Sequence, residues 1–232
     1  MNQPPHSRLF GASLGFLAGY VDTLGFIALF GLFTAHVTGN FVLIGAALAE
    51  PARVPILLKI LAFPAFIAGI VVTRLMVLAI ERRGGAALTP ALLLQWMLLA
   101  GFMLFGSLAE PVGKEASDLA MIAGLLGTAA MGVHSATSRL LLAHLAPTSM
   151  MTGNVTQIVL DTVDVLRGAA DGATRARCGK FFWPLLAFAL GAIAAGFGYL
   201  AFGFVALAIP LLVLGALIVV QQRSARAAVP LA

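Results

Sequence analysis

The 232-residue chain is 61% hydrophobic and only 10% charged, with a mean hydropathy of +1.03. Soluble domains carry about 25% charged residues, so this composition excludes a soluble protein. Apolar runs of about 20 residues recur along the whole length, which excludes a soluble domain with a single membrane anchor. The formal charge of +5 indicates basic cytoplasmic loops rather than nucleic-acid binding. The single cysteine, Cys178, allows no internal disulfide and argues against a structural zinc site.

The first apolar run extends from about Leu9 to Phe33. It is longer than the apolar core of a secretory signal and is interrupted by Asp22, so we expect a retained first helix. Gly11, Gly15 and Gly19 follow at four-residue spacing, which places them on one helix face. This pattern predicts close packing against the backbone of another helix.

The remaining segments divide the chain into two similar halves. In the first half we expect apolar segments over 35–49, 59–80 and 89–108, followed by a mixed-charge linker over 110–118. In the second half we expect them over 119–145, 148–166, 181–200 and 202–220, with a basic loop over 167–180. The predicted fold is an all-α polytopic membrane protein with eight apolar segments. These form two pseudo-repeats of four, 9–109 and 118–220, within a single membrane domain over 1–232.

The same tripeptide opens the second segment of each half. Thr38-Gly39-Asn40 and Thr152-Gly153-Asn154 are 114 positions apart in otherwise apolar surroundings. Polar groups in a membrane-type sequence are costly unless something binds them. The duplication therefore predicts a pseudo-symmetric polar site, as in transporters built from internal repeats.

Two topologies fit the distribution of basic residues. If all eight segments cross, ten of the 14 Lys/Arg are cytoplasmic, and the exceptions are Arg74, Arg82, Arg83 and Arg139. If the two short Thr-Gly-Asn segments are re-entrant, six helices cross and only Arg53, Lys59 and Lys114 are outside. Both alternatives predict a multi-pass protein of the inner membrane with both termini in the cytoplasm.

Two signatures in the chain resemble a known family. The first reads Gly19-x-Val21-Asp22-x-x-x-Phe26 and then Phe33-x-Ala35-x-x-Thr38-Gly39-Asn40. The second reads Gly132-x-x-x-Ala136-x-x-Arg139 and then Thr148-x-x-Met151-Thr152-Gly153-Asn154-x-Thr156. Together they resemble the YoaK-like family of bacterial membrane proteins, a domain family of unknown function. The resemblance covers nearly the whole chain and implies a bacterial cytoplasmic membrane. His134-Ser135 stands where the family pattern has carboxamides.

Asp22 is the strongest single candidate for chemistry. A carboxylate at the centre of a membrane helix is unfavourable by about 2.5–3.5 kcal/mol on insertion scales and usually faces a partner or water. One interpretation is a proton or cation site that couples to transport. The other is a buried ion pair with Arg139 or Arg74 that holds helices together. His36 and His134 are candidates for coupling or gating, although a lone histidine among apolar neighbours is more often a core residue.

The carboxamides of Asn40 and Asn154 offer two donors and one acceptor each. With Thr38 and Thr152 they could hold a polar solute or ion at the start of two short helices. Alternatively, the threonines cap helices while the asparagines bind neighbouring backbone. Neither a metal-ligand cluster nor a base–nucleophile spacing is present in the sequence, so we expect no enzyme, no cofactor and no metal.

Two functional hypotheses remain. The first is a transporter of a small solute or ion, with the two Thr-Gly-Asn motifs as its binding site. The second is a non-transporting membrane scaffold or assembly protein, in which the same residues only lock helix packing. The expected partners are membrane lipid and an unknown small solute or ion, without nucleic acid, and a homo-oligomer is left open.

Overall fold

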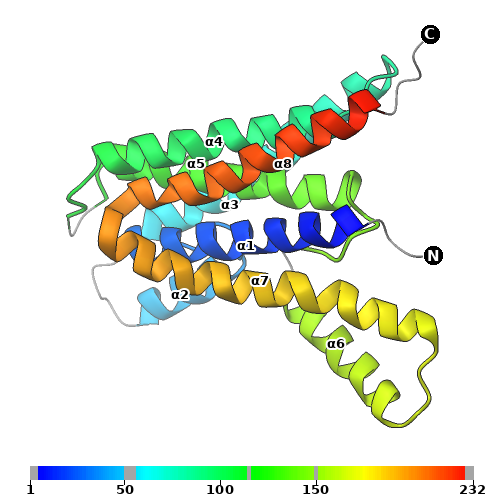
Figure 1. The fold of residues 1–232 in the computed structure, drawn as a ribbon. Helices are drawn as coiled ribbons and strands as arrows, with labels where there is room; N and C mark the ends of the chain where they lie inside the picture. The colour runs from blue at the N-terminus through cyan, green and yellow to red at the C-terminus, as the bar shows by residue number, and fades with distance from the viewer. Residues whose placement is uncertain (1–4, 50–55, 114–115, 149–150, 228–232) are drawn as a thin grey trace.

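The computed structural model describes residues 5–49, 56–113, 116–148 and 151–227, and these contain helices and their connections, with no strands. The helices are α1 (Pro5–Ala28), α2 (Gly39–Ala49), α3 (Ile56–Glu81), α4 (Leu88–Leu108), α5 (Asp118–Leu140), α6 (Met151–Leu166), α7 (Gly172–Phe202), the short 3₁₀ helix η1 (Gly203–Leu207) and α8 (Ala208–Ala227). The long helices run along one another as a bundle, and α2 and α6 diverge from it on one side (Figure 1).

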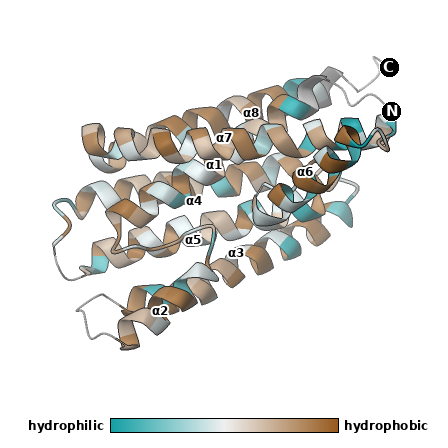
Figure 2. Ribbon diagram, turned by 90° about the horizontal axis from the view of Figure 1, so that it is seen from below, coloured by the Kyte–Doolittle hydropathy of each residue, from teal (hydrophilic) through white to brown (hydrophobic). Residues whose placement is uncertain are grey.

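The bundle is that of a polytopic membrane protein. Within the described residues, five stretches are long and apolar enough to cross a membrane, and the last, Gly172–Ser224, contains α7, η1 and most of α8. The chain turns back within this stretch at Gly203, whose φ is +57° (Figure 1). Apolar residues cover most of the length of the helices (Figure 2). Many of them are exposed on α3 and α7, as expected for surfaces that meet lipid.

Neither of the two Thr-Gly-Asn helices is among the candidate spans of the described chain. Helix α2 has 11 residues, or about 16 Å at 1.5 Å per residue, against about 30 Å of hydrocarbon. Helix α6 has 16 residues and is also not among the candidate spans. The structure therefore supports a polytopic α-helical protein but not eight crossing segments.

Two helix pairs cross where glycines remove side chains from the contact. A Cβ at Gly19 in α1 would overlap the carbonyl oxygen of Phe188 in α7, and one at Gly191 in α7 would overlap the carbonyl oxygen of Phe16 in α1. Gly15 meets the backbone of Pro184 in the same way, so the predicted close packing on the glycine face of α1 is confirmed.

The α3–α5 crossing has the same reciprocal form. A Cβ at Gly69 in α3 would overlap the carbonyl oxygen of Ala129, and one at Gly132 in α5 would overlap the carbonyl oxygen of Phe66. Gly19 of α1 and Gly132 of α5 are 113 positions apart. Phe16 and Ala129, whose carbonyl groups contact the glycine of the partner helix, are also 113 positions apart. Helix α1 thus meets α7 in the way that α5 meets α3.

Several helix ends differ from the sequence-based expectation. Helix α1 ends at Ala28 rather than Phe33, because Phe30 and Gly31 adopt positive φ angles of 55° and 73° that terminate a helix. Helix α4 begins at Leu88, one residue before the expected start, with Ala87 at its N-cap position. Helix α7 begins at Gly172, because the Asp171 side chain accepts a hydrogen bond from the Thr174 backbone N–H and caps it.

Candidate functional site

The residues that precede each short helix fold back onto its asparagine. Asn40 Nδ2 donates to the Phe33 carbonyl oxygen at 2.8 Å, and Asn40 Oδ1 accepts from the Phe33 N–H at 3.0 Å. In the second motif, Asn154 Nδ2 donates to the Pro147 carbonyl oxygen at 2.7 Å. Both carboxamides are buried and both reach back seven residues. The asparagines therefore fix the shape of two equivalent loops.

Asp22 of α1 holds the first loop. Its Oδ1 accepts from the Ala35 N–H at 2.6 Å and from the Thr34 hydroxyl at 3.3 Å, and its Oδ2 lies 2.7 Å from His36 Nδ1. Asp22 is buried, whereas 34% of the His36 side chain is exposed. The carboxylate thus lies behind an imidazole that reaches the surface of the described chain.

His134 of α5 holds the second loop. Its Nε2 lies 2.8 Å from the Thr148 hydroxyl oxygen, and its Nδ1 lies 3.2 Å from Gln95 Nε2 of α4. Because an amide nitrogen only donates, Nδ1 is the acceptor in this arrangement and Nε2–H donates to Thr148. All three side chains are buried. A neutral imidazole therefore anchors the second loop, as the Asp22 carboxylate anchors the first.

Thr34 and Thr148, the loop residues that reach these two anchors, are 114 positions apart, the same offset as the motifs. The 114-position offset is present in the sequence, but the apolar residues around the two threonines give no sign that they contact an anchor. The contribution of Gln95 has no sequence signal beyond a carboxamide within an apolar helix.

The two motifs meet at one cavity of about 370 Å³. Its walls come from the first loop, the first turn of α6, the middle of α3 and the C-terminal part of α5; they are Ala35, His36, Val37, Thr38, Phe66, Ser135, Met151, Thr152 and Gly153. Thr38, Thr152 and Gly153 are exposed, so the cavity is open on the side of the bundle that carries α2 and α6. Its volume lies within the range of small-molecule sites.

The lining offers hydroxyl and imidazole groups against an apolar wall. Two short helices, α2 and α6, begin at this cavity, so the positive ends of their dipoles lie there. The first amides of α2 are already occupied, because Gly39, Asn40 and Phe41 donate to carbonyls of the preceding turn. A solute in the cavity would therefore meet side-chain groups rather than free amides of α2. The N-terminus of α2 would add a weakly positive field.

Some of the candidate residues line the cavity, and others lie behind its wall. Thr38, Thr152, Gly153 and His36 line it. Gly39 packs on the Phe33 ring, the two asparagines bind loop backbone, and Asp22 and His134 anchor the loops from behind. Arg139 is exposed in the last turn of α5, and Arg74 is exposed on α3. No group of three His, Cys, Asp or Glu in the described residues could hold a metal ion.

Comparison with known proteins decides the family. Residues 10–220 match the family model described as "Protein of unknown function (DUF1275)". The chain belongs to this family. An 88-residue stretch is 35% identical to the UPF0700 transmembrane protein YoaK of Bacillus subtilis (strain 168), covering 38% of this chain and 37% of that protein. This supports the resemblance to YoaK-like proteins and a multi-pass membrane protein. No solved structure matches the chain.

Proposed function

We propose that this protein transports a small polar solute or ion, which binds at the cavity between the two Thr-Gly-Asn motifs. The observation that carries the proposal is the meeting of two segments, 114 positions apart in sequence, at one cavity lined by Thr38, Thr152 and Gly153. Sites formed where two broken helices meet between repeats are typical of secondary transporters.

The two halves are, on this proposal, inverted repeats. Three sets of equivalent contacts support this: the reciprocal glycine crossings, the asparagine bonds that reach back seven residues, and the threonines that reach the loop anchors. Each half contributes one helix to each glycine crossing, so α1–α7 and α3–α5 are natural rigid pairs. Rocking of one pair against the other would open the cavity to either side of the membrane.

On this proposal, α2 and α6 are re-entrant helices in a bacterial cytoplasmic membrane. The first turn of α1 and the last turn of α8 lie at the same end of the bundle (Figure 1). The loop with Arg82 and Arg83 and the exposed Arg139 lie at that end too. The positive-inside rule then favours cytoplasmic termini and six crossings.

Within this mechanism, Asp22 and His36 form the coupling element. His36 lines the cavity, and its Nδ1 touches the buried Asp22 carboxylate, which also holds two groups of the loop. A proton that enters the cavity would reach Asp22 through the His36 imidazole, and protonation of the carboxylate would weaken its hydrogen bonds to the loop that carries Thr38. We expect Asp22→Asn to uncouple transport from protons.

One observation favours the scaffold alternative. Asn40 and Asn154 make their hydrogen bonds to their own loops, as they would if the motif served packing alone. The transporter and the scaffold differ in the access of water to the cavity. Transport requires a cavity that is hydrated and can connect to both sides of the membrane, whereas packing alone does not.

The test uses a cysteine in the cavity. Thr38→Cys, in a Cys178→Ser background, is labelled in membranes with a small, membrane-impermeant maleimide applied from each side. We expect labelling of the folded protein, and we expect Gly153→Trp to slow it at least ten-fold. A Cβ at Gly153 meets nothing within 4 Å, and Gly153 lines the cavity, so we expect an indole there to obstruct the cavity.

Gly45→Trp is the matched control, because Gly45 also has open space around it but does not line the cavity. It should leave the labelling rate unchanged. Osmotic swelling of proteoliposomes in urea, glycerol, formate and acetate then identifies permeant solutes, and Gly153→Trp should abolish any swelling that the protein causes. Labelling of Thr38→Cys only after denaturation would overturn the transporter and favour the scaffold.

A further inference from the structure

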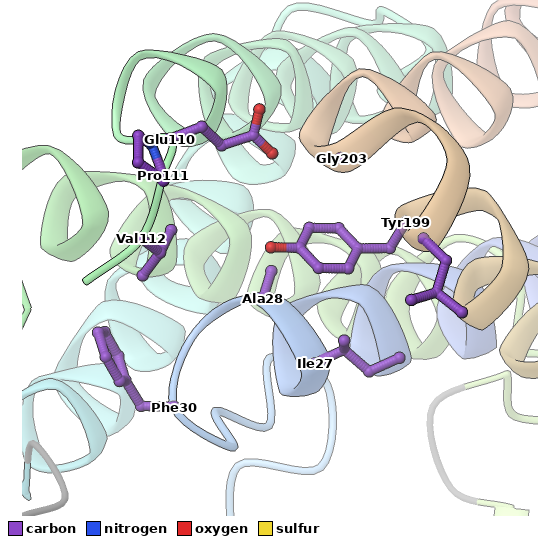
Figure 3. Close-up of a pocket in the computed structure, with 9 residues that line it drawn as sticks. Ile27, Ala28, Phe30, Glu110, Pro111, Val112, Tyr199 and Gly203 are labelled. Carbon is purple, nitrogen blue, oxygen red and sulfur yellow. The ribbon is translucent and has the colours of Figure 1, made fainter. Parts of the chain in front are cut away.

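A second, larger cavity lies at the opposite end of the bundle from the chain termini. It has a volume of about 690 Å³ and is lined by Ile27, Ala28, Phe30, Glu110, Tyr199 and Gly203, among others. Figure 3 shows the Glu110 carboxylate and the Tyr199 hydroxyl on the two sides of this space, with the Phe30 ring farther along the wall. None of its residues belongs to the Thr-Gly-Asn cavity.

The polar wall of this cavity is held in place by Phe204. The backbone N–H of Phe204 donates to Glu110 Oε1 at 3.0 Å, and its ring meets the Tyr199 ring edge-on at 5.7 Å. Gly203 allows this approach, because its φ is +57° and a Cβ there would overlap the Glu110 carboxylate. Among the described residues, Oε2 of Glu110 has no hydrogen-bond donor, so it is available to a ligand.

The electrostatics of the cavity favour a cation. Glu110 is its only charged lining residue within the described chain. The lining also comes from the C-terminal ends of three helices, since α1 ends at Ala28, α4 at Leu108 and α7 at Phe202. Each helix C-terminus carries a partial negative charge.

The chain already places one cation at this end. Lys59 Nζ donates to the Phe30 carbonyl oxygen at 2.6 Å, just beyond the end of α1. Lys59 is buried and outside the lining, so it offsets the negative end of α1, while Glu110 has no salt-bridge partner among the described residues.

The size and aromatic content of the cavity decide the kind of cation. A single carboxylate without further acidic or histidine ligands does not make a metal site. The volume suits a small organic molecule, and the rings of Tyr199 and Phe30 can contact an alkylammonium group by cation–π interaction. We propose that this cavity binds small organic ammonium cations, with Glu110 as the counter-charge and Tyr199 as the aromatic contact.

Choline and its uncharged isostere 3,3-dimethylbutan-1-ol test the proposal. Both are titrated by NMR against the full chain in a maltoside detergent, which contains no choline headgroup. We expect saturable choline binding, and binding of the alcohol at least ten-fold weaker. Glu110→Gln should weaken choline binding at least ten-fold, because the amide oxygen can still accept from Phe204 while the charge is lost.

Glu81→Gln is the matched control, since Glu81 is an exposed carboxylate at the other end of the bundle, and it should leave choline binding unchanged. If Glu110→Gln does not fold, Ile27→Trp provides the test by filling the cavity from a half-exposed position, and it should abolish binding. Equal affinity for choline and the alcohol, unchanged choline binding in both cavity variants, or failure of choline to saturate would each overturn the proposal.

Discussion

The buried carboxamides of Asn40 and Asn154 show how two polar residues are kept inside an apolar sequence. Each donates a hydrogen bond to a backbone carbonyl of its own loop, which satisfies both polar groups inside the protein. The chain thereby presents Thr38 and Thr152, rather than the asparagines, to the cavity. Within each motif, the asparagine positions the loop and the threonine faces the cavity.

Asn40→Ala should therefore destabilise the protein. The substitution leaves both the N–H and the carbonyl of Phe33 without the Asn40 partner, and a buried unsatisfied group costs about 1–3 kcal/mol. Reversible unfolding in mixed micelles measures the change in free energy. Thr156→Ala is the control, because it removes an exposed hydroxyl that bonds only to its own helix, and its effect should stay within about 0.5 kcal/mol. Equal stability of the two variants would contradict the positioning role of Asn40.

The duplicated motif and its spacing were predictable from the sequence, because repetition of costly residues is visible without coordinates. The direction of each side chain was not. Whether a carboxamide points at a cavity or at its own loop depends on the path of residues 29–38, and that path follows from the positive φ of Phe30 and Gly31. A non-glycine residue in that conformation has no clear sequence signal.

Glycines allow helices from the two halves of the chain to pack in close backbone contact. Gly19 and Gly191 bring α1 and α7 into backbone contact, and Gly69 and Gly132 do the same for α3 and α5. The four-residue glycine spacing predicted this contact for α1, since one helix face without side chains admits another backbone. The partner helix was not predictable, because spacing specifies a face and not what packs on it.

Gly191→Ala should consequently loosen the α1–α7 pair. Its methyl group would overlap the Phe16 carbonyl oxygen, and backbone yields less readily than a flexible side chain. We expect a loss of about 1–3 kcal/mol, typical of overpacking, measured by unfolding in mixed micelles. Gly45→Ala, on the open face of α2, should instead be neutral or stabilising by up to about 1 kcal/mol. A neutral Gly191→Ala would contradict the close contact.

The α6–α7 hairpin is joined by an ion pair between Asp161 of α6, which lies outside the candidate spans, and Arg177 near the start of the last span. Arg177 Nη2 lies 2.7 Å from Asp161 Oδ1, and Arg177 Nε lies 3.0 Å from Oδ2. This bidentate hydrogen bond lowers the pKa of Asp161 below its usual value, with a further contribution from Gln157. The α6 helix, which carries Thr152, is thus fixed to α7 at its far end.

The hairpin should loosen in acid. A carboxyl with a lowered pKa in the folded state contributes stability above its unfolded pKa of about 3.9, and this contribution is lost as pH falls through the folded value. Hydrogen exchange of α6 amides should therefore accelerate below about pH 4 relative to those of α5. Asp161→Asn should remove this pH dependence while accelerating exchange at neutral pH. An unchanged acid profile in Asp161→Asn would contradict the role of the pair.

At the scale of the whole molecule, the two cavities lie at different levels of the bundle. The Thr-Gly-Asn cavity is bounded by Phe66 from the middle of α3 and by Ser135 from the C-terminal part of α5, whereas the Glu110 cavity lies at the end where α1, α4 and α7 finish. With the termini in the cytoplasm, the Glu110 cavity would face the outside of the cell. The topology therefore determines from which side each would take its ligand.

Two single cysteines separate the six-crossing topology from the eight-crossing one. In a Cys178→Ser background, Arg82→Cys lies in the exposed connection between α3 and α4, and Gly113→Cys lies in exposed, open space after α4. With re-entrant α2 and α6 and cytoplasmic termini, an impermeant maleimide should label Arg82→Cys only from the cytoplasm and Gly113→Cys only from outside. Eight crossings reverse both results, because one additional crossing precedes each position. The reversed pattern would therefore exclude re-entrant helices, and with them the meeting of two helix N-termini within the membrane on which the proposed transport site depends.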